Sequence, residues 1–298
     1  MKKSVVVMNL VGGFLVATAL LAWVYLPGQV KKTPLNVDTV TQLEGTAQLG
    51  EDRFPVKAES ITRADSAKSD GDVVSFVNSS CLIRDQGDPP GCVSNDDPQN
   101  RLINASTDHF ATDRTTALAV NDPKYLPADA EPHQGLVNKW PFDSEKKDYP
   151  YWDGTIGKTV TAAYDGTTTV KGLDVYRYVA KVPPTPVELA AGLQGTYATT
   201  QTIYVEPRTG AIVNQRNQQE RVGEDGKNFL TVDVSFTDDE IAQSVDDANA
   251  NIFKLDLVTR IVPLVALIIG VPLLLAGLAL TFRGGRKETG DRVPEHAA

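Results

Sequence analysis

The residues that could carry acid–base chemistry or bind a metal in this chain are few. Outside the C-terminal tail there are two histidines, His109 and His133. His109 lies in STDHFATDR, beside Asp108 and Asp113, where a general base or metal ligand is conceivable, although a solvent-facing strand histidine is the simpler interpretation. No GxSxG, HExxH, P-loop or dinucleotide-binding motif occurs. Paired carboxylates for glycoside hydrolysis stay open, because a sequence does not show their separation. We therefore expect no catalytic residue and no cofactor.

Two acidic turns, SDGDVV (69–74) and SNDDPQN (94–100), are the other places where chemistry could reside. Such turns could hold calcium weakly, but they lack the spacing of an EF-hand loop. We expect them to be solvated turns, and we expect no metal site.

The densest aromatic stretch is KWPFDSEKKDYPYWDG, residues 139–154. One interpretation is that its aromatic rings are core residues that anchor an irregular, proline-constrained loop. The other is an aromatic groove for a sugar ring or an acyl chain, since Tyr and Trp combine a large apolar area with a polar handle. Under this second hypothesis the candidate ligand-binding residues are Trp140, Phe142, Tyr149, Tyr151 and Trp152, and the ligand is a lipid or glycolipid.

The two ends of the chain indicate how these residues are held near a membrane. Residues 4–26 and 261–282 carry no charge, and helices of these lengths can cross a bilayer core of about 30 Å. The alternative for the first run is a cleaved signal peptide, but its apolar residues continue past the ATA cleavage candidate at 17–19. We predict two transmembrane helices over these two ranges.

Basic residues near the membrane ends predict the orientation. More of them flank the two termini than the inner ends of the two helices, which predicts a cytoplasmic N-terminus (1–3) and a cytoplasmic tail (283–298). Cys81 and Cys92, the two cysteines, bracket a turn-rich loop, and we expect them to form a disulfide in an oxidising compartment, with unpaired thiols as the alternative. The predicted location is the cytoplasmic membrane, with two passes and a large extracytoplasmic domain.

Between the helices, residues 27–236 are expected to form the extracytoplasmic, β-rich domain. TTTV (167–170) and VYRYVAKV (175–182) predict a hairpin with Gly172 in the turn, and TIYVEPRTGAIVNQ (202–215) predicts another. VVSFV (73–77), CLI (81–83), DHFAT (108–112) and ALAV (117–120) are further strand candidates. We expect VPPTPVELAAGLQG (182–195) to cross the surface with one helical turn. The predicted fold is a mainly β ectodomain with an antiparallel meander.

Residues 237–260 predict an amphipathic juxtamembrane helix. Thr237 and Glu240 fit a capping box, and apolar residues repeat at Ile241, Val245, Ala248, Ile252 and Leu255. This helix either packs on its own sheet or forms a stalk that pairs with another helix. The acidic chain, with a formal net charge of −9, is a poor candidate for nucleic-acid binding.

Four segments occur in order between the helices: STDHFATDRTTALAV, GLVNKWPFDSEKKDYPYWD, VYRYVAKVPPT and TIYVEPRTGAIVNQ. Together they resemble the actinobacterial porin PorA-like family, which implies a cell-envelope protein and brings no agreed catalytic residues. The family name implies a porin, but two uncharged apolar helices cannot enclose a water-filled pore alone, and the chain lacks the many amphipathic strands of an outer-membrane barrel.

The arrangement also resembles, as analogy only, the class B scavenger receptors, which pass lipids through a β-rich ectodomain between two terminal helices. We therefore expect a non-enzymatic envelope protein that handles or escorts lipid or lipoglycan outside the cytoplasmic membrane. The alternatives are an oligomeric porin or channel subunit, and an accessory subunit of a membrane complex. The expected partners are a membrane lipid or lipoglycan, envelope-assembly proteins or further copies of the chain.

Overall fold

Short turns join most of the strands, so most sequential neighbours pair. In the hairpin over residues 167–182, for example, Lys171 and Gly172 have φ of 45° and 85°, the left-handed backbone that a tight two-residue turn requires. The computed structural model describes residues 3–87 and 91–288. These fall into two units, Lys32–Asn251 and the pair Met1–Lys31 with Ile252–Ala298. Residues 1–2 and 289–298 of the predicted cytoplasmic ends lie outside the described residues.

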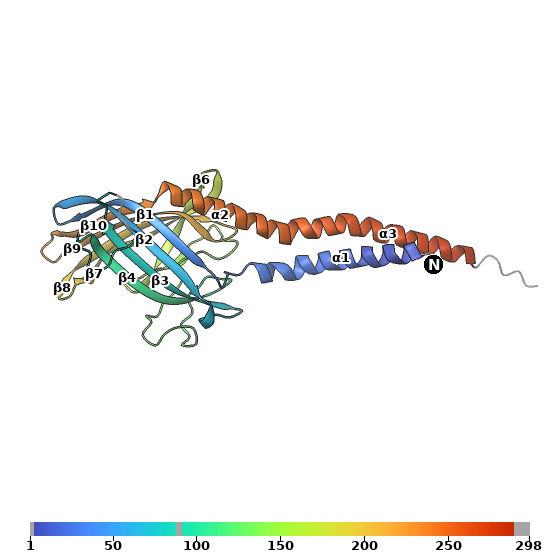
Figure 1. Cartoon of the computed structure of the whole chain (residues 1–298), viewed down its shortest axis with the longest axis horizontal. Coiled ribbons are helices and arrows are strands. Elements are labelled where there is room, and N and C mark those ends of the chain that lie inside the picture. The colour runs from blue at the N-terminus through green and yellow to red at the C-terminus, as the bar shows by residue number, and fades with distance from the viewer. Residues whose placement is uncertain (1–2, 88–90, 289–298) are drawn as a thin grey trace, which may run out of the picture. The chain divides into compact units, whose positions relative to one another are not determined.

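The first of these units, called the β unit below, holds one antiparallel sheet. Within the described residues the sheet has ten strands in the order β4-β3-β2-β1-β10-β9-β8-β7-β6-β5 (Figure 1), which confirms the predicted mainly β fold with an antiparallel meander. The strands are β1 Asp38–Leu49, β2 Asp52–Asp65, β3 Val73–Arg84, β4 Leu102–Asp113, β5 Tyr149–Asp153, β6 Lys158–Val170, β7 Leu173–Ala190, β8 Leu193–Glu206, β9 Ala211–Gly223 and β10 Asn228–Phe236, and the short 3-10 helix η1 Ser66–Lys68 follows β2.

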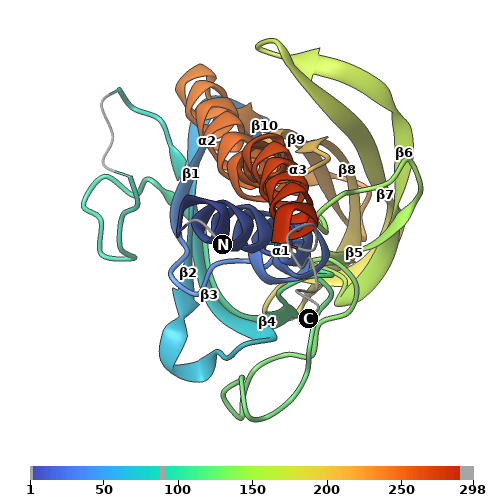
Figure 2. The same cartoon turned by 90° about the vertical axis from the view of Figure 1, so that its right-hand side faces the viewer.

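The sheet curls, as Figure 2 shows, and two short segments link its edge strands. Residues 118–120 pair with the end of β4, and Leu136 pairs with Tyr151 of β5. The amide of Ala119 donates to the carbonyl of Gly135 at 2.9 Å, so the two segments also pair with each other. We call residues 118–120 and 135–136 the closing segments. The predicted strand at 117–120 is therefore one link in the closure of the sheet.

The prediction for residues 182–195 was wrong. This stretch is the end of β7, a tight turn and the start of β8. β7 pairs with β6 only up to Ala180, and beyond Val182 it pairs with β8 alone. Proline can sit in a strand where one side has no ladder to donate to, so the three prolines interrupt the register without ending the strand.

Helix α2, Asp238–Asp256, begins as predicted. The Thr237 hydroxyl accepts a hydrogen bond from the Glu240 amide at 3.1 Å, which is half of a capping box. The Glu240 carboxylate instead accepts from the Gln42 amide of β1 at 3.0 Å. Val245 and Ala248 are buried against Val175 and Val213 of the sheet, so this part of α2 packs on its own sheet.

The second unit, the helix unit, is formed by α1 Lys3–Val30 and by α3 Val262–Glu288, which follows the π-helical turn η2 Leu257–Ile261. Both α1 and the run that contains α3 are long and apolar enough to cross a membrane. Glycines let the two helices approach: a Cβ on Gly12 would lie 2.6 Å from the Leu274 amide nitrogen. A polar contact joins the helices: the Asn9 amide donates to the Thr281 hydroxyl at 3.1 Å.

Candidate functional site

The interior of the curled sheet holds most of the predicted aromatic site. Trp140 has no exposed surface, and its ring lies 5.4 Å from that of Tyr151 and 5.1 Å from that of Tyr178. Tyr149 joins the same cluster from β5. We call the whole group the aromatic cluster, and the side of the sheet that carries it the inner face: Ala117, Leu136, Trp140, Tyr149, Tyr151, Ala162, Tyr178, Ala180, Ile203 and Val205.

Backbone contacts fix Trp140 in this position. Its amide donates to the carbonyl of Gly210 at 2.9 Å. Gly210 has a φ of 73°, and a Cβ there would collide with the Trp140 carbonyl oxygen, so the β8–β9 turn must carry glycine to let Trp140 in. This packing is what the core interpretation requires. Binding of a lipid or glycolipid by these residues stays a prediction.

The other two candidates lie outside the aromatic cluster. Phe142 is half-buried, and the Lys139 amine lies 4.0 Å from its ring centre. Trp152 is half-buried, and its ring lies 4.9 Å from that of His133. The five aromatic residues therefore do not line one common surface.

His133 is buried, and sequence reasoning did not find its partner. Its Nε2 lies 2.9 Å from a carboxylate oxygen of Asp108, and its Nδ1 lies 2.9 Å from the carbonyl oxygen of Glu131. Both ring nitrogens are thus engaged, which leaves neither free to act as a base on a substrate or to bind a metal. His109 is half-buried on β4. Among the described residues no group of three or more potential metal ligands occurs.

Polar side chains continue the inner face along β8, beyond Ile203 and Val205. Residues two apart on a strand share a face, so Gln201, Thr199 and Tyr197 follow the cluster. Gln215 of β9 donates to Gln201 at 3.2 Å, and the Tyr197 hydroxyl donates to Asp153 at 3.1 Å. Burial, with the nearby Asp153 charge, raises the pKa of Tyr197 to about 12. Tyr197, Thr199 and Gln201 are all buried, so these polar side chains extend the packed interior of the sheet.

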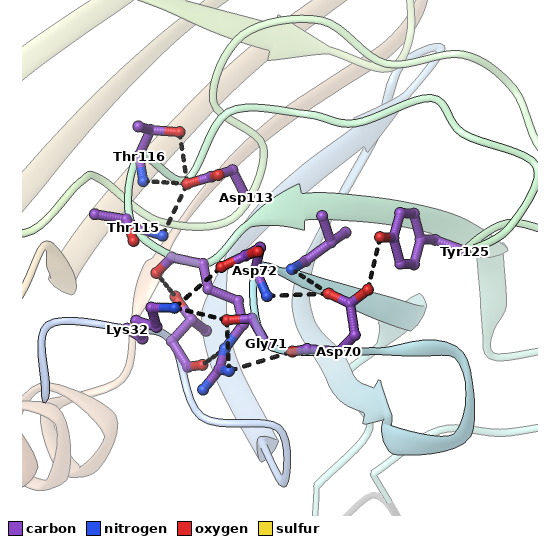
Figure 3. Close-up of polar contacts among 11 residues, drawn as sticks. Lys32, Asp70, Gly71, Asp72, Asp113, Thr115, Thr116 and Tyr125 are labelled. Carbon is purple, nitrogen blue, oxygen red and sulfur yellow. Dashed lines mark hydrogen bonds and ion pairs between the residues drawn. The ribbon is translucent and has the colours of Figure 1, made fainter. Parts of the chain in front are cut away.

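A polar network holds the first residues of the β unit (Figure 3). The Lys32 amine donates to Asp72 at 3.1 Å and to the Gly71 carbonyl at 2.8 Å. Arg114 donates to the Thr33 carbonyl at 2.7 Å and also to two carbonyls of the turn before β3. The start of the unit, the turn at 70–72 and the end of β4 are thereby fixed to one another.

Asp70 is the centre of the second half of this network. Its carboxylate accepts from the Lys124 amine at 2.6 Å and from the Tyr125 hydroxyl at 2.8 Å. The Lys124 hydrogen bond, with backbone and Tyr125 bonds, lowers the pKa of Asp70 well below its usual range. The predicted solvated turn at 69–74 is therefore an anchoring turn. In the other acidic turn, Asp97 forms an ion pair with Arg101 at 2.7 Å.

Lys139 is a cation for which no carboxylate partner is found within the described part of the chain. Its amine lies 3.4 Å from the Thr33 hydroxyl and over the Phe142 ring. Burial of the amine lowers the pKa of Lys139 to about 8. The sequence signal was present, since Lys139 precedes Trp140, but only the fold shows that the amine is enclosed.

The predicted disulfide is confirmed. Cys81 of β3 is bonded to Cys92, and their Cα atoms lie 6.0 Å apart. The pair closes the loop that leads from β3 towards β4.

Comparison with known proteins decides the family. The sequence matches the model of the family described as Porin PorA over residues 5–279. The chain belongs to the porin PorA family. A relative described as Porin PorA, from Corynebacterium amycolatum, is 26% identical over an alignment that covers 69% of this chain and 74% of the relative. These findings confirm the resemblance and identify an envelope protein of a porin family with two helices suited to a membrane.

Among the solved structures that match the chain is one described as an outer membrane lipoprotein-sorting protein domain, from Vibrio parahaemolyticus. It is 8% identical and has a TM-score of 0.18, over 74% of this chain and 95% of that chain. A TM-score of this size does not establish a common fold.

Proposed function

We propose that this protein is a non-enzymatic subunit of an oligomeric channel in the cell envelope. It is anchored in the cytoplasmic membrane by α1 and α3, with both termini cytoplasmic and the β unit outside. The observation that carries the proposal is the family match over residues 5–279, which spans most of both helices. The porin reading thus replaces lipid escort as the favoured function.

The β unit is not itself the passage through the lipid. A membrane barrel turns an apolar band outward and a polar surface inward. Here the side of the sheet opposite the inner face carries Arg216, paired with Asp233 at 2.6 Å, and the exposed Glu220. The inner face is packed around the fully buried Trp140. Both observations support a water-exposed unit with a filled interior.

One helix pair cannot conduct alone, so the channel requires several copies. The side chains that α1 and α3 leave exposed are mainly large and apolar, and they would either face lipid or meet other copies: Val7, Leu10, Phe14, Leu21, Val24, Leu264, Ile268, Leu275 and Phe282. On α1, Ser4 and Thr18 are exposed hydroxyl residues. They are two heptads apart and thus lie on one face of the helix. We assign this face to the lumen.

Solute efflux from proteoliposomes tests the proposal. The full-length protein, separated by size into oligomer and monomer, should release a small hydrophilic solute in the oligomer fraction and retain a large dextran. Oligomeric protein that is inserted and folded but releases no more solute than empty liposomes would contradict a channel.

A further inference from the structure

The sheet ends in β4 on one side and in β5 on the other. The outer edge of β5 is covered, whereas that of β4 is open along part of its length. At the β5 edge, Leu136 donates to the Pro150 carbonyl and accepts from the Trp152 amide, both at 2.8 Å. At the end of β4, Val120 donates to the Ala111 carbonyl and Asp113 donates to the Leu118 carbonyl, both at 2.8 Å. The closing segments therefore protect one edge and the last part of the other.

These bonds also reveal which backbone groups of β4 point away from β3. In an antiparallel strand, alternate residues direct their N–H and C=O to the same side. Ala111 and Asp113 point outward, and the register with β3 is regular from Asn104 to Asp113. Ala105, Thr107 and His109 therefore point outward as well. Within residues 3–87 and 91–288, no hydrogen bond to their backbone groups is found.

This stretch also lacks the features that usually block pairing at an edge. Natural proteins protect exposed edges with lysine, proline, bulges or very short strands. Residues 104–107 are exposed and carry no charge and no proline, and β4 has twelve residues. The edge is thus long, regular where it is exposed, and able to accept another extended strand.

We propose that the β4 edge pairs antiparallel with the β4 edge of a second copy, with Thr107 on the two-fold axis. This register pairs Thr107 with Thr107 and Ala105 with His109, and it satisfies every outward group of the three residues with about six hydrogen bonds. On the opposite face of the sheet, the same register places the side chain of Ser106 opposite that of Asp108. No like charges lie opposite each other, and a Thr–Thr cross-strand pair is favourable.

A second copy of the chain is the partner that the proposed channel needs. This inference rests on the proposed channel function, because a channel requires several copies. A contact this small is weak when the copies diffuse freely. Anchoring both copies in one membrane raises their effective concentration. The acidic composition of the chain, with a formal net charge of −9, opposes close approach, so salt that screens this repulsion should strengthen the pair.

Cysteine cross-linking of the full-length protein in membranes tests the register. Residues in a hydrogen-bonded antiparallel pair have Cα atoms about 5.5 Å apart, within the range that a disulfide spans. Both native cysteines are bonded to each other, so Thr107→Cys adds a single thiol. It should give a disulfide-linked dimer under mild oxidation, at several times the yield of Thr46→Cys. Thr46 is the matched control because β1 is paired there on both sides. Equal yields for the two variants would overturn the inference.

A second variant tests whether the dimer forms through the β4 edge or through the helices. Thr107→Pro removes an outward N–H, which an edge strand tolerates, so the domain should fold while the dimer fraction falls at least tenfold. An unchanged dimer fraction in the folded variant, measured by lysine cross-linking in the same membranes, would also overturn the inference. The solute-efflux assay distinguishes this inference from the proposed function. Efflux without cross-linking at Thr107 would contradict the edge pairing alone, and cross-linking without efflux would contradict the channel.

Discussion

The amide of Ala119 donates to the carbonyl of Gly135 at 2.9 Å, and this bond joins the two closing segments of the curled sheet. Gly135 has a φ of 72°, and a Cβ there would lie 2.6 Å from the carbonyl oxygen of Pro150. The closure of the sheet therefore depends on a residue without a side chain at this position.

Gly135→Ala should destabilise the β unit more than the same change at a glycine with free space. Gly157 is the matched control, because its φ is 60° and a Cβ there would meet nothing within 4 Å. We expect about 1–2 kcal/mol for Gly157→Ala from backbone strain, and about 3 kcal/mol or more for Gly135→Ala, where a clash adds to that strain. Denaturant unfolding of both variants measures the difference. Equal losses would show that the closing segments tolerate displacement.

Lys139 should make stability depend on pH in the alkaline range. Burial lowers its pKa from 10.5 to about 8. The unfolded chain then binds more protons between these two values, so the free energy of unfolding rises as pH increases through that window. Lys139→Met should raise the free energy of unfolding near pH 7 by up to about 3 kcal/mol, and the gain should vanish near pH 10.5.

The control for this prediction is Lys158→Met, at an exposed position of β6. Thermal unfolding of the full-length protein across the window gives the comparison. A gain at Lys139 that stays constant from neutral to alkaline pH would show that its amine is not desolvated.

Replacing Trp140 and Trp152 by alanine, one at a time, distinguishes a role in the core from a role in ligand binding. Trp140 is fully buried, so Trp140→Ala should cost about 3–5 kcal/mol of stability. Trp152 is half-buried beside His133, so Trp152→Ala should cost less and leave a folded protein. If the aromatic stretch binds a glycolipid, the folded Trp152→Ala variant should show weaker photo-cross-linking to a glycolipid probe than the wild type. Unchanged labelling would remove Trp152 from any such site.

Gly12 and Gly13 provide a matched pair for the helix unit. A Cβ on Gly12 would meet the Leu274 backbone, whereas one on Gly13 would meet nothing within 4 Å. Gly12→Leu should therefore separate α1 from α3, and Gly13→Leu should leave them packed. Disulfide formation between cysteines placed at Asn9 and Thr281, whose polar side chains are in contact, reports the packing. We expect cross-linking to fall severalfold for Gly12→Leu only. A parallel fall in both variants would mean that the two helices do not use this face.

Much of the fold could be predicted because local signals agree with it. Turn residues such as Gly172 and Gly210 mark hairpins. The alternation of side chains along a strand puts Val175 and Tyr178 on opposite faces, and the structure has them in different clusters. Strands β1 and β2 were missed, because their apolar residues are few and mixed with polar ones. Their place in the sheet comes from partners far along the chain, which a local pattern does not show.

The candidate site was less predictable, because its contacts join residues that are far apart along the chain. Asp108 and His133 are 25 residues apart, and no local pattern connects them. The closing segments are too short to show periodicity, so their role in joining β4 to β5 depends on tertiary pairing. The aromatic stretch was found from composition alone, but composition does not distinguish a packed core from a groove. The disulfide between the two cysteines was fully predictable from the sequence, because only a short loop separates them.

The channel itself is tested most directly by current across a planar lipid bilayer that holds the full-length protein. We predict discrete current steps, which a small water-soluble thiol reagent blocks in Thr18→Cys but not in Leu21→Cys. Leu21 is 68% exposed and lies about 60° from Thr18 around the helix, outside the lumen face. Folded, inserted protein that gives no current steps at any density would contradict a channel, and equal block of the two variants would contradict the assigned lumen face.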